Sequence, residues 1–297
     1  TCHACAKIHV RFMIALATFI IIIMATGYMD DGTESSHRAF MKLLSNLPHC
    51  GKHNGSTVFV APTQLVSPSQ PKAAVLDHCK SSVLAHLEVH ASYLPRKGRH
   101  ATSLPHRHHD EEVILMLGGA ASLTANGPVA TRGDLIYHPP QADHRIVASP
   151  MEGSSMVRES QYLAIRWTLV SRVQSLLEEG SLLRMPGDTS QFVEWSEPPA
   201  STVFRGGCRQ TLLHRPTQWG SVQVHSTCLA PGKAGTNIHT DPHDVMIVVL
   251  RGTLQALPGG TLLPAGSVTY FASHSRHGVR NADNSTTSVH LAFEFLT

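Results

Sequence analysis

The sequence lacks several features that mark large classes of protein. Only 15% of its 297 residues are charged, the formal net charge is +3, and no segment gathers lysine and arginine into a cluster. A nucleic-acid-binding protein normally concentrates basic residues on one face or helix, so we expect no nucleic-acid partner. Amphipathic helical spacing is also scarce, because the only good example runs from Thr168 to Arg184.

Cysteine is sparse, and beyond residue 28 no two cysteines stand in a CxxC pair. The four that remain there are Cys50, Cys79, Cys208 and Cys228. An even number of cysteines is compatible with disulfides in a secreted protein. Cys2 and Cys5 precede an apolar segment and would be removed with it, so we assign no zinc or redox site to them.

That N-terminal apolar segment is short for a membrane span. Residues 12–25 read FMIALATFIIIIMA after a weakly basic start, whereas a spanning helix needs roughly 20 residues. The length fits the h-region of a secretory signal, and the small residues at 25–27 offer a cleavage site. Sequons at Asn54 and Asn284 agree with secretion. We therefore expect a secreted protein; an uncleaved membrane anchor is the alternative.

Histidine, in contrast, is abundant, at 21 residues. Because it is the commonest protein metal ligand, its spacing is informative. His106, His108 and Glu112 stand in the pattern HxHxxxE, and His144 follows in the pattern GxxxxxPxQxxH. Alternate residues of an extended segment point to one face, so the first two histidines can meet one ion. Three imidazoles and a carboxylate suit Mn, Fe, Cu, Ni or Zn, and open coordination positions would permit chemistry.

The chain also contains an internal duplication. His144 falls on His277 at an offset of 133 residues, and Gly119 and Gly133 fall on glycines at the same offset. Residues 87–95 resemble 222–231. Residues 162–167 (YLAIRW) likewise resemble 290–295 (HLAFEF). Several landmarks at one offset indicate two copies of one module.

Each copy has the pattern of β structure. Residues 113–117 (VILML) and 246–250 (MIVVL) are short apolar runs that reach a glycine turn within two residues. Residues 134–137 and 267–271 follow a second glycine in the same way. Short strands with glycine punctuation favour a sandwich or a barrel over βαβ units. We predict an all-β chain with a short linker helix over Thr168–Arg184, packed on a barrel.

The second copy keeps only part of the ligand pattern. The offset places His239, Asp241, Val245 and His277 at the four ligand positions. One interpretation is a degenerate site in a barrel that is structural or merely holds a ligand. The other is a two-histidine, one-carboxylate set of His239, Asp241 and His277, which leaves three coordination positions for substrate and O2. His243 and His274 are alternative ligands, and a second metal in this copy stays open.

These blocks resemble the paired motifs of the cupin superfamily, G(x)5HxH(x)3–4E(x)6G and G(x)5PxGxxH(x)3N. Glu112 and Gly119 keep the E(x)6G spacing. Gly98 stands eight residues before His106 where the family usually has six, and Gln141 replaces a motif glycine. The resemblance implies two tandem double-stranded β-helix (jelly-roll) barrels. The metal ligands that it implies in the first barrel are His106, His108, Glu112 and His144.

Together with the apolar N-terminal segment and the expected helix, the resemblance divides the chain into five segments. These are 1–27, a signal peptide or membrane anchor; 28–75, an N-terminal extension; 76–167, cupin domain 1; 168–205, a linker with the helix; and 206–297, cupin domain 2. We expect the extension to wrap the first barrel or to stay loose. A homodimer paired through barrel edges is implied by analogy with the family.

Cupins include oxalate-degrading enzymes, ring-cleaving dioxygenases, isomerases and non-catalytic binding proteins, and the fold alone does not choose among them. The complete first site favours a metal-dependent oxidoreductase or lyase that acts on a small oxygen-rich compound. The alternative is a non-catalytic small-molecule-binding or structural cupin. Glu88, His90 and Tyr137 are candidates for proton handling because they lie on expected strands, with a structural role as the alternative. Arg107 and Arg145 adjoin ligands, but neighbouring strand residues point away from the site.

Overall fold

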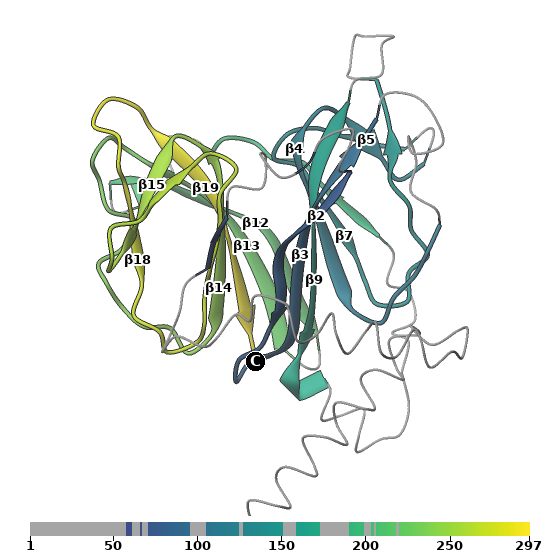
Figure 1. Ribbon diagram of the computed structural model, residues 1–297, viewed down its shortest axis with the longest axis horizontal. Helices are drawn as coiled ribbons and strands as arrows, with labels where there is room; N and C mark the ends of the chain where they lie inside the picture. The colour runs from purple at the N-terminus through teal and green to yellow at the C-terminus, as the bar shows by residue number, and fades with distance from the viewer. Residues whose placement is uncertain are drawn as a thin grey trace, which may run out of the picture.

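The computed structural model describes residues 58–60, 66, 71–95, 105–124, 127–150, 159–172, 190–198, 203–204, 206–217 and 220–297. Over these ranges the chain is almost entirely β-strand and forms two barrels side by side, one in blue and teal and the other in green and yellow (Figure 1). The predicted all-β class with two tandem barrels is confirmed. Within the described ranges, no helix has the length and hydropathy to cross a bilayer. The expected signal or anchor at 1–27 lies outside them.

The first barrel is built around a six-stranded antiparallel sheet of order β10-β7-β4-β9-β3-β2. Its strands are β2 (Lys72–Cys79), β3 (Leu84–Leu94), β4 (Glu111–Gly118), β7 (Leu135–His138), β9 (Ser160–Leu169) and β10 (Gln191–Val193). A smaller sheet completes it, in the order β6-β5-β8, from β5 (Ala121–Ser122), β6 (Val129–Ala130) and β8 (Val147–Ala148). The predicted strands at 113–117 and 134–137 correspond to β4 and β7.

The second barrel repeats this plan with a seven-stranded sheet of order β1-β17-β14-β19-β13-β12-β11. Its strands are β1 (Val58–Val60), β11 (Val203–Phe204), β12 (Gly207–Thr217), β13 (Gly220–Leu229), β14 (Asp244–Arg251), β17 (Val268–Phe271) and β19 (Ser288–Leu296). Its smaller sheet, of order β16-β15-β18, contains β15 (Thr253–Leu257), β16 (Leu262–Pro264) and β18 (Gly278–Asn281). The predicted strands at 246–250 and 267–271 correspond to β14 and β17.

The connecting segments contribute strands to the barrels. β1 comes from the expected N-terminal extension, yet it pairs antiparallel with β17 of the second barrel and not with the first. β10 comes from the expected linker and pairs with β7 of the first barrel. β2 begins at Lys72, four residues inside the expected extension. Strand pairing therefore ties both connecting segments to the barrels.

The predicted start of the linker helix at Thr168 is wrong. Thr168 and Leu169 instead complete β9, because they continue its ladder to β3, with His86 opposite Thr168 and Leu84 opposite Leu169. Residues 170–172 are helical, and residues 173–184 lie outside the described ranges.

Alternating side chains of the large sheets divide between two kinds of core. Along β4, Ile114 and Met116 belong to the interior cluster of the first barrel, whereas Val113 and Leu115 belong to a cluster shared with the second barrel. β14 alternates in the same way. The two large sheets thus meet back to back, as the central strands of Figure 1 show.

The shared core includes aromatic contacts between the barrels. Trp167 and Phe295 are almost fully buried, with ring centroids 5.6 Å apart. Burying a side chain the size of Phe295 contributes about 1.5–3 kcal/mol. Arg215 lies over the ring of Tyr137 at 5.0 Å. Tyr137 therefore faces the neighbouring barrel and not the interior of its own, which rules out the proton-handling role considered for it.

Two features bear on the repeat and on the cysteines. Gly119 follows β4 with φ +71°, and a Cβ there would lie 2.2 Å from the carbonyl oxygen of Glu159. The second copy therefore keeps glycine at the equivalent position, Gly252, with φ +76°.

Cys208 and Cys228 face each other across β12 and β13 and form a disulfide. Cys79 is disulfide-bonded as well.

Candidate metal centre

A short backbone bridge brings the two ligand motifs of each barrel together. In the first barrel His106 and His144 pair antiparallel, with N–H to O=C distances of 3.1 and 3.0 Å. In the second barrel His239 and His277 pair in the same way, at 2.9 Å in both directions. Glu112, at the start of β4, lies on the inward-facing side of that strand. The fold thus explains why residues distant in sequence meet at one end of each barrel.

All four predicted ligands of the first barrel converge. One donor atom from each of His106, His108, Glu112 and His144 lies within 4.8 Å of the other three. His108 Nε2 is 3.5 Å and His144 Nε2 is 2.9 Å from Glu112 Oε2. The fold therefore brings together the four residues that the sequence proposed as ligands.

Backbone contacts orient these imidazoles for metal binding. His108 Nδ1 lies 2.9 Å from the carbonyl oxygen of Asp110, and His144 Nδ1 lies 2.9 Å from that of Ala142. A carbonyl oxygen accepts only, so each Nδ1 carries a proton and each Nε2 is turned toward Glu112 and the other ligands. A ligating histidine commonly has its second nitrogen fixed in this way.

Three buried atoms of this group face one another without meeting hydrogen-bond geometry: His108 Nε2 and His144 Nε2 lie 3.5 and 2.9 Å from Glu112 Oε2. An unpaired buried polar atom costs about 1–3 kcal/mol, and buried polar atoms usually find partners. Three such atoms that converge on one point fit the donor set of a divalent transition metal. His106 is exposed and lies at the open side of the group.

Arg166 holds the carboxylate of Glu112 from the neighbouring strand. Its Nε donates to Glu112 Oε1 at 3.0 Å, and the two residues are register partners in β9 and β4. Burial would raise the pKa of Glu112, but the close approach of His108 and His144, together with Arg166, holds it well below its ordinary value. The carboxylate is ionised, as a metal ligand must be.

His138 adjoins this group, although the sequence motifs did not single it out. It is fully buried and stacks on His144, with ring centroids 4.1 Å apart and an interplanar angle of 15°. Burial, reinforced by His144, lowers the pKa of His138 to about 3. Phe271 stacks on His277 in the same manner, at 4.6 Å and 18°. The offset of 133 residues already aligned His138 with Phe271, so the repeat contained the signal for this ring platform.

The other sequence candidates of the first barrel have different roles. Glu88 Oε1 and His90 Nδ1 lie 2.8 Å apart, so these two side chains interact with each other. Burial would raise the pKa of Glu88, but the contact with His90 lowers it to about 2. Arg107 and Arg145 are exposed, in line with the expectation that they point away from the ligands.

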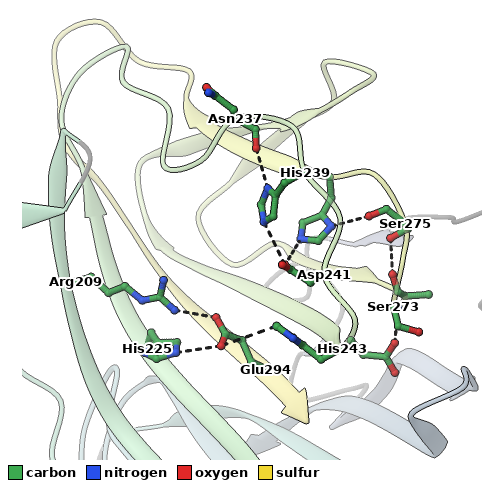
Figure 2. A network of polar contacts seen from close by, with 12 residues as sticks. Arg209, His225, Asn237, His239, Asp241, His243, Ser273, Ser275 and Glu294 are labelled. Carbon is green, nitrogen blue, oxygen red and sulfur yellow. Dashed lines mark hydrogen bonds and ion pairs between the residues drawn. The ribbon is translucent and has the colours of Figure 1, made fainter. Parts of the chain in front are cut away.

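The second barrel gathers a smaller group. Donor atoms of His239, Asp241 and His277 lie within 4.8 Å of one another, and the two Nε2 atoms are 3.1 and 3.2 Å from Asp241 Oδ2 (Figure 2). The Nδ1 atoms of both histidines contact backbone carbonyls at 2.8 and 2.9 Å, which again turns each Nε2 toward the carboxylate of the group. Val245 takes the place of Glu112. His243 and His274, considered as alternative ligands, are not members of the group.

A pocket of about 100 Å³ lies beside this second group. Ligand-group residues on its wall are His239, Asp241 and His277, and apolar wall residues include Val245, Ile247, Val279 and Ala292. Arg280, which the sequence placed near this site, is exposed and donates to Gln255. It does not line the pocket.

Comparison with known proteins gives structural matches only, since no protein-family model and no curated protein matches the sequence. A cupin 2 conserved barrel domain protein from Leptotrichia buccalis covers 82% of this chain and 98% of its own, at 11% identity and a TM-score of 0.49. Salicylate 1,2-dioxygenase from Pseudaminobacter salicylatoxidans covers 90% and 95%, at 13% identity and a TM-score of 0.54. This chain has the bicupin fold.

A mutant of that dioxygenase in complex with gentisate covers 90% of this chain and 93% of its own, at 13% identity and a TM-score of 0.54. The bicupin architecture inferred from the motifs is thereby confirmed. Similarity at this level establishes the fold, and the reaction must be argued from the site.

Proposed function

We propose that this bicupin is a metal-dependent enzyme that acts on a small oxygen-rich compound. The observation that carries the proposal is the convergence of buried donor atoms from His108, Glu112 and His144 on one point, with His106 at their open side. A protein that only needed the barrel as a scaffold would gain nothing from burying a carboxylate and two imidazoles around one point, because burying polar groups costs free energy. The chain thus provides three imidazoles and one carboxylate for one divalent ion.

A bound Mn, Fe, Cu, Ni or Zn ion supplies Lewis-acid chemistry, and the redox-active ones supply electron transfer. Residues of the chain orient the donor atoms that would bind such an ion. Arg166 fixes one oxygen of Glu112 and thereby directs the other toward the histidines. Backbone carbonyls fix the tautomers of His108 and His144. These contacts preorganise the donor set, which an active metal site requires.

Oxidoreductase chemistry of the dioxygenase or decarboxylase/oxidase type is our preferred reaction class. The salicylate 1,2-dioxygenase with the same fold, and the gentisate complex of its mutant, support a small-molecule substrate. The non-catalytic alternative predicts binding of such a compound without turnover.

We further propose that His239, Asp241 and His277 hold a second ion. Both imidazoles present Nε2 to one carboxylate oxygen at nearly equal distances, 3.1 and 3.2 Å. Burial, reinforced by His239, lowers the pKa of His277, which keeps this ring neutral and able to bind an ion. With only three protein ligands, this second ion would have more open coordination positions than an ion in the first barrel.

Turnover tests the enzyme proposal directly. The metal-loaded chain is incubated with a panel of small hydroxylated and carboxylated compounds, while oxygen uptake and product formation are followed. We expect turnover of at least one compound, lost in His106→Ala and retained in His214→Ala, which changes an exposed histidine outside both groups. Binding without turnover across the panel would favour the non-catalytic alternative.

A further inference from the structure

The pocket of the second barrel carries polar side chains that the three-residue ligand group does not use. Glu294 and His290 of β19 line it, together with Arg209 of β12. Glu294 is the register partner of Val245, whereas in the first barrel Arg166 is the register partner of Glu112. The charge at this wall position is therefore reversed between the two barrels, so the two interiors favour different ligand groups.

Glu294 is fixed in its position by basic neighbours (Figure 2). Arg209 Nη2 donates to its Oε1 at 2.8 Å, and His225 Nε2 and His243 Nε2 lie 3.3 and 4.0 Å from its Oε2. Burial would raise the pKa of Glu294, but His225 and Arg209 hold it below its ordinary value. The pocket wall therefore presents an ionised and immobilised hydrogen-bond acceptor.

His290 adds an unpartnered polar group to the same wall. It is 4% exposed, and its Nδ1 has no hydrogen-bond partner. Burial, reinforced by Arg209, lowers the pKa of His290 to about 4, so the ring is neutral and has both a donor and an acceptor nitrogen. A buried polar atom without a partner is unfavourable, and a polar ligand in the pocket would relieve that cost.

We propose that this pocket binds a small hydroxycarboxylate. Its carboxylate would face the group of His239, Asp241 and His277, and its hydroxyl would donate to Glu294. Val245, Ile247 and Ala292 supply an apolar surface for a short carbon chain. Contact between the carboxylate and a bound ion rests on the second metal proposed above.

The surroundings of Glu294 favour a neutral donor over a cationic one. Arg209 already offsets its charge, and His225 and His243 lie close by. An ammonium group would be repelled by the guanidinium of Arg209, whereas a hydroxyl can donate to the carboxylate without adding charge. The pocket of about 100 Å³ has room for a short carbon chain with its polar groups.

Three probes with one carbon skeleton test the proposal: propionate, 3-hydroxypropionate and 3-aminopropionate. Their binding to the full chain loaded with Mn²⁺ is measured by titration calorimetry. A hydrogen bond to a charged group predicts that 3-hydroxypropionate binds about tenfold more tightly than propionate, and more tightly than 3-aminopropionate. Equal affinities, or a preference for the amine, would overturn the proposal.

Matched variants assign the effect to Glu294. Glu294→Gln should remove most of the advantage of 3-hydroxypropionate, whereas Glu197→Gln should retain it, because Glu197 is 47% exposed and pairs with Arg251 at the surface. His290→Phe should block all three probes by filling the pocket. A hydroxyl preference that persists in Glu294→Gln would contradict the assignment. If Glu294→Gln does not fold, the relative affinities of the three probes and the loss of binding in His290→Phe still test the proposal.

Metal content, measured on the same samples, separates this proposal from the one on which it rests. A second ion bound without any hydroxyl preference overturns the hydroxycarboxylate site alone. A hydroxyl preference without a second ion overturns the ion alone. Absence of both overturns both. Probe binding that is lost in His106→Ala but kept in His277→Ala would place the ligand in the first barrel and overturn the second-barrel site.

Discussion

Arg166 donates from Nε to Glu112 Oε1 at 3.0 Å, across the neighbouring strands β9 and β4. The other oxygen of Glu112 lies 2.9 Å from His144 Nε2. The corresponding pair in the second barrel is Glu294 and Val245. At this pair of positions the carboxylate lies on β4 in the first barrel and on β19, the neighbouring strand, in the second. The two barrels share one fold but carry the negative charge on different strands.

Removing Arg166 should weaken metal binding in the first barrel. Arg166→Leu leaves Glu112 without the hydrogen bond that fixes its orientation, and loss of such a partner costs about 10- to 100-fold in metal affinity. Competition with a chelator of known affinity measures the change. Arg251→Leu is the control, since Arg251 is 52% exposed and pairs with Glu197 at the surface. Equal losses in both variants would show that the effect is not specific to Glu112.

Transferring the first barrel's pair into the second should strengthen the second site. Val245→Glu restores a carboxylate at the position of Glu112, but Glu294 beside it would repel the new charge. The double variant Val245→Glu with Glu294→Arg recreates the arrangement of Glu112 and Arg166. We expect it to bind metal in this barrel at least about tenfold more tightly than Val245→Glu alone. Metal titration of both variants decides, and an equal affinity would count against the role assigned to the arginine.

The stability of the metal-free protein should depend on pH through His290. Its folded-state pKa, about 4, lies below the ordinary value of 6.5. Between these values the unfolded chain binds more protons, so His290 contributes stability above pH 6.5 that is lost as the pH falls toward 4. His290→Gln should reduce the slope of the unfolding free energy in this window by about 1.4 kcal/mol per pH unit. Denaturant unfolding at several pH values measures it, and an unchanged slope would show that His290 does not titrate this way.

The N-terminal segment gives a prediction about the mature chain. The disulfide between Cys208 and Cys228 supports a secreted protein, because disulfides persist in oxidising compartments. We therefore propose that the segment 1–27 is removed. N-terminal sequencing of the secreted protein should begin at or near Tyr28. Recovery of the intact segment in a membrane fraction would support the anchor instead.

The sequence predicted the ligand groups because each ligand stands in a short motif of regular spacing. His106 and His108 alternate on one extended segment, and His144 follows a second motif whose place was visible from the repeat. The strands of both copies were readable from short apolar runs and glycine turns for the same reason. Local pattern and repeat together located all seven proposed ligands.

The residues that tune the sites were not predicted, because their roles depend on strand order. Arg166 and Glu294 lie on the last strand of each copy, far from the motifs, and reach the site only because that strand pairs with β4 or β14. The alignment of YLAIRW with HLAFEF had placed Arg166 opposite Glu294. The strand register was needed to show that Arg166 faces Glu112 and that Glu294 faces Val245. The pairing of β1 with the second barrel was equally invisible, since it joins segments over 200 residues apart.

Metal content is the most direct test of the central claim. The purified chain is supplied with Mn, Fe, Cu, Ni and Zn in turn, dialysed and examined by elemental analysis, beside His144→Ala and the exposed-histidine control His214→Ala. We expect His144→Ala to lose about one equivalent of ion per chain, while His214→Ala keeps the native content. A native chain that retains no divalent metal, or a His144→Ala variant with undiminished content, would contradict it.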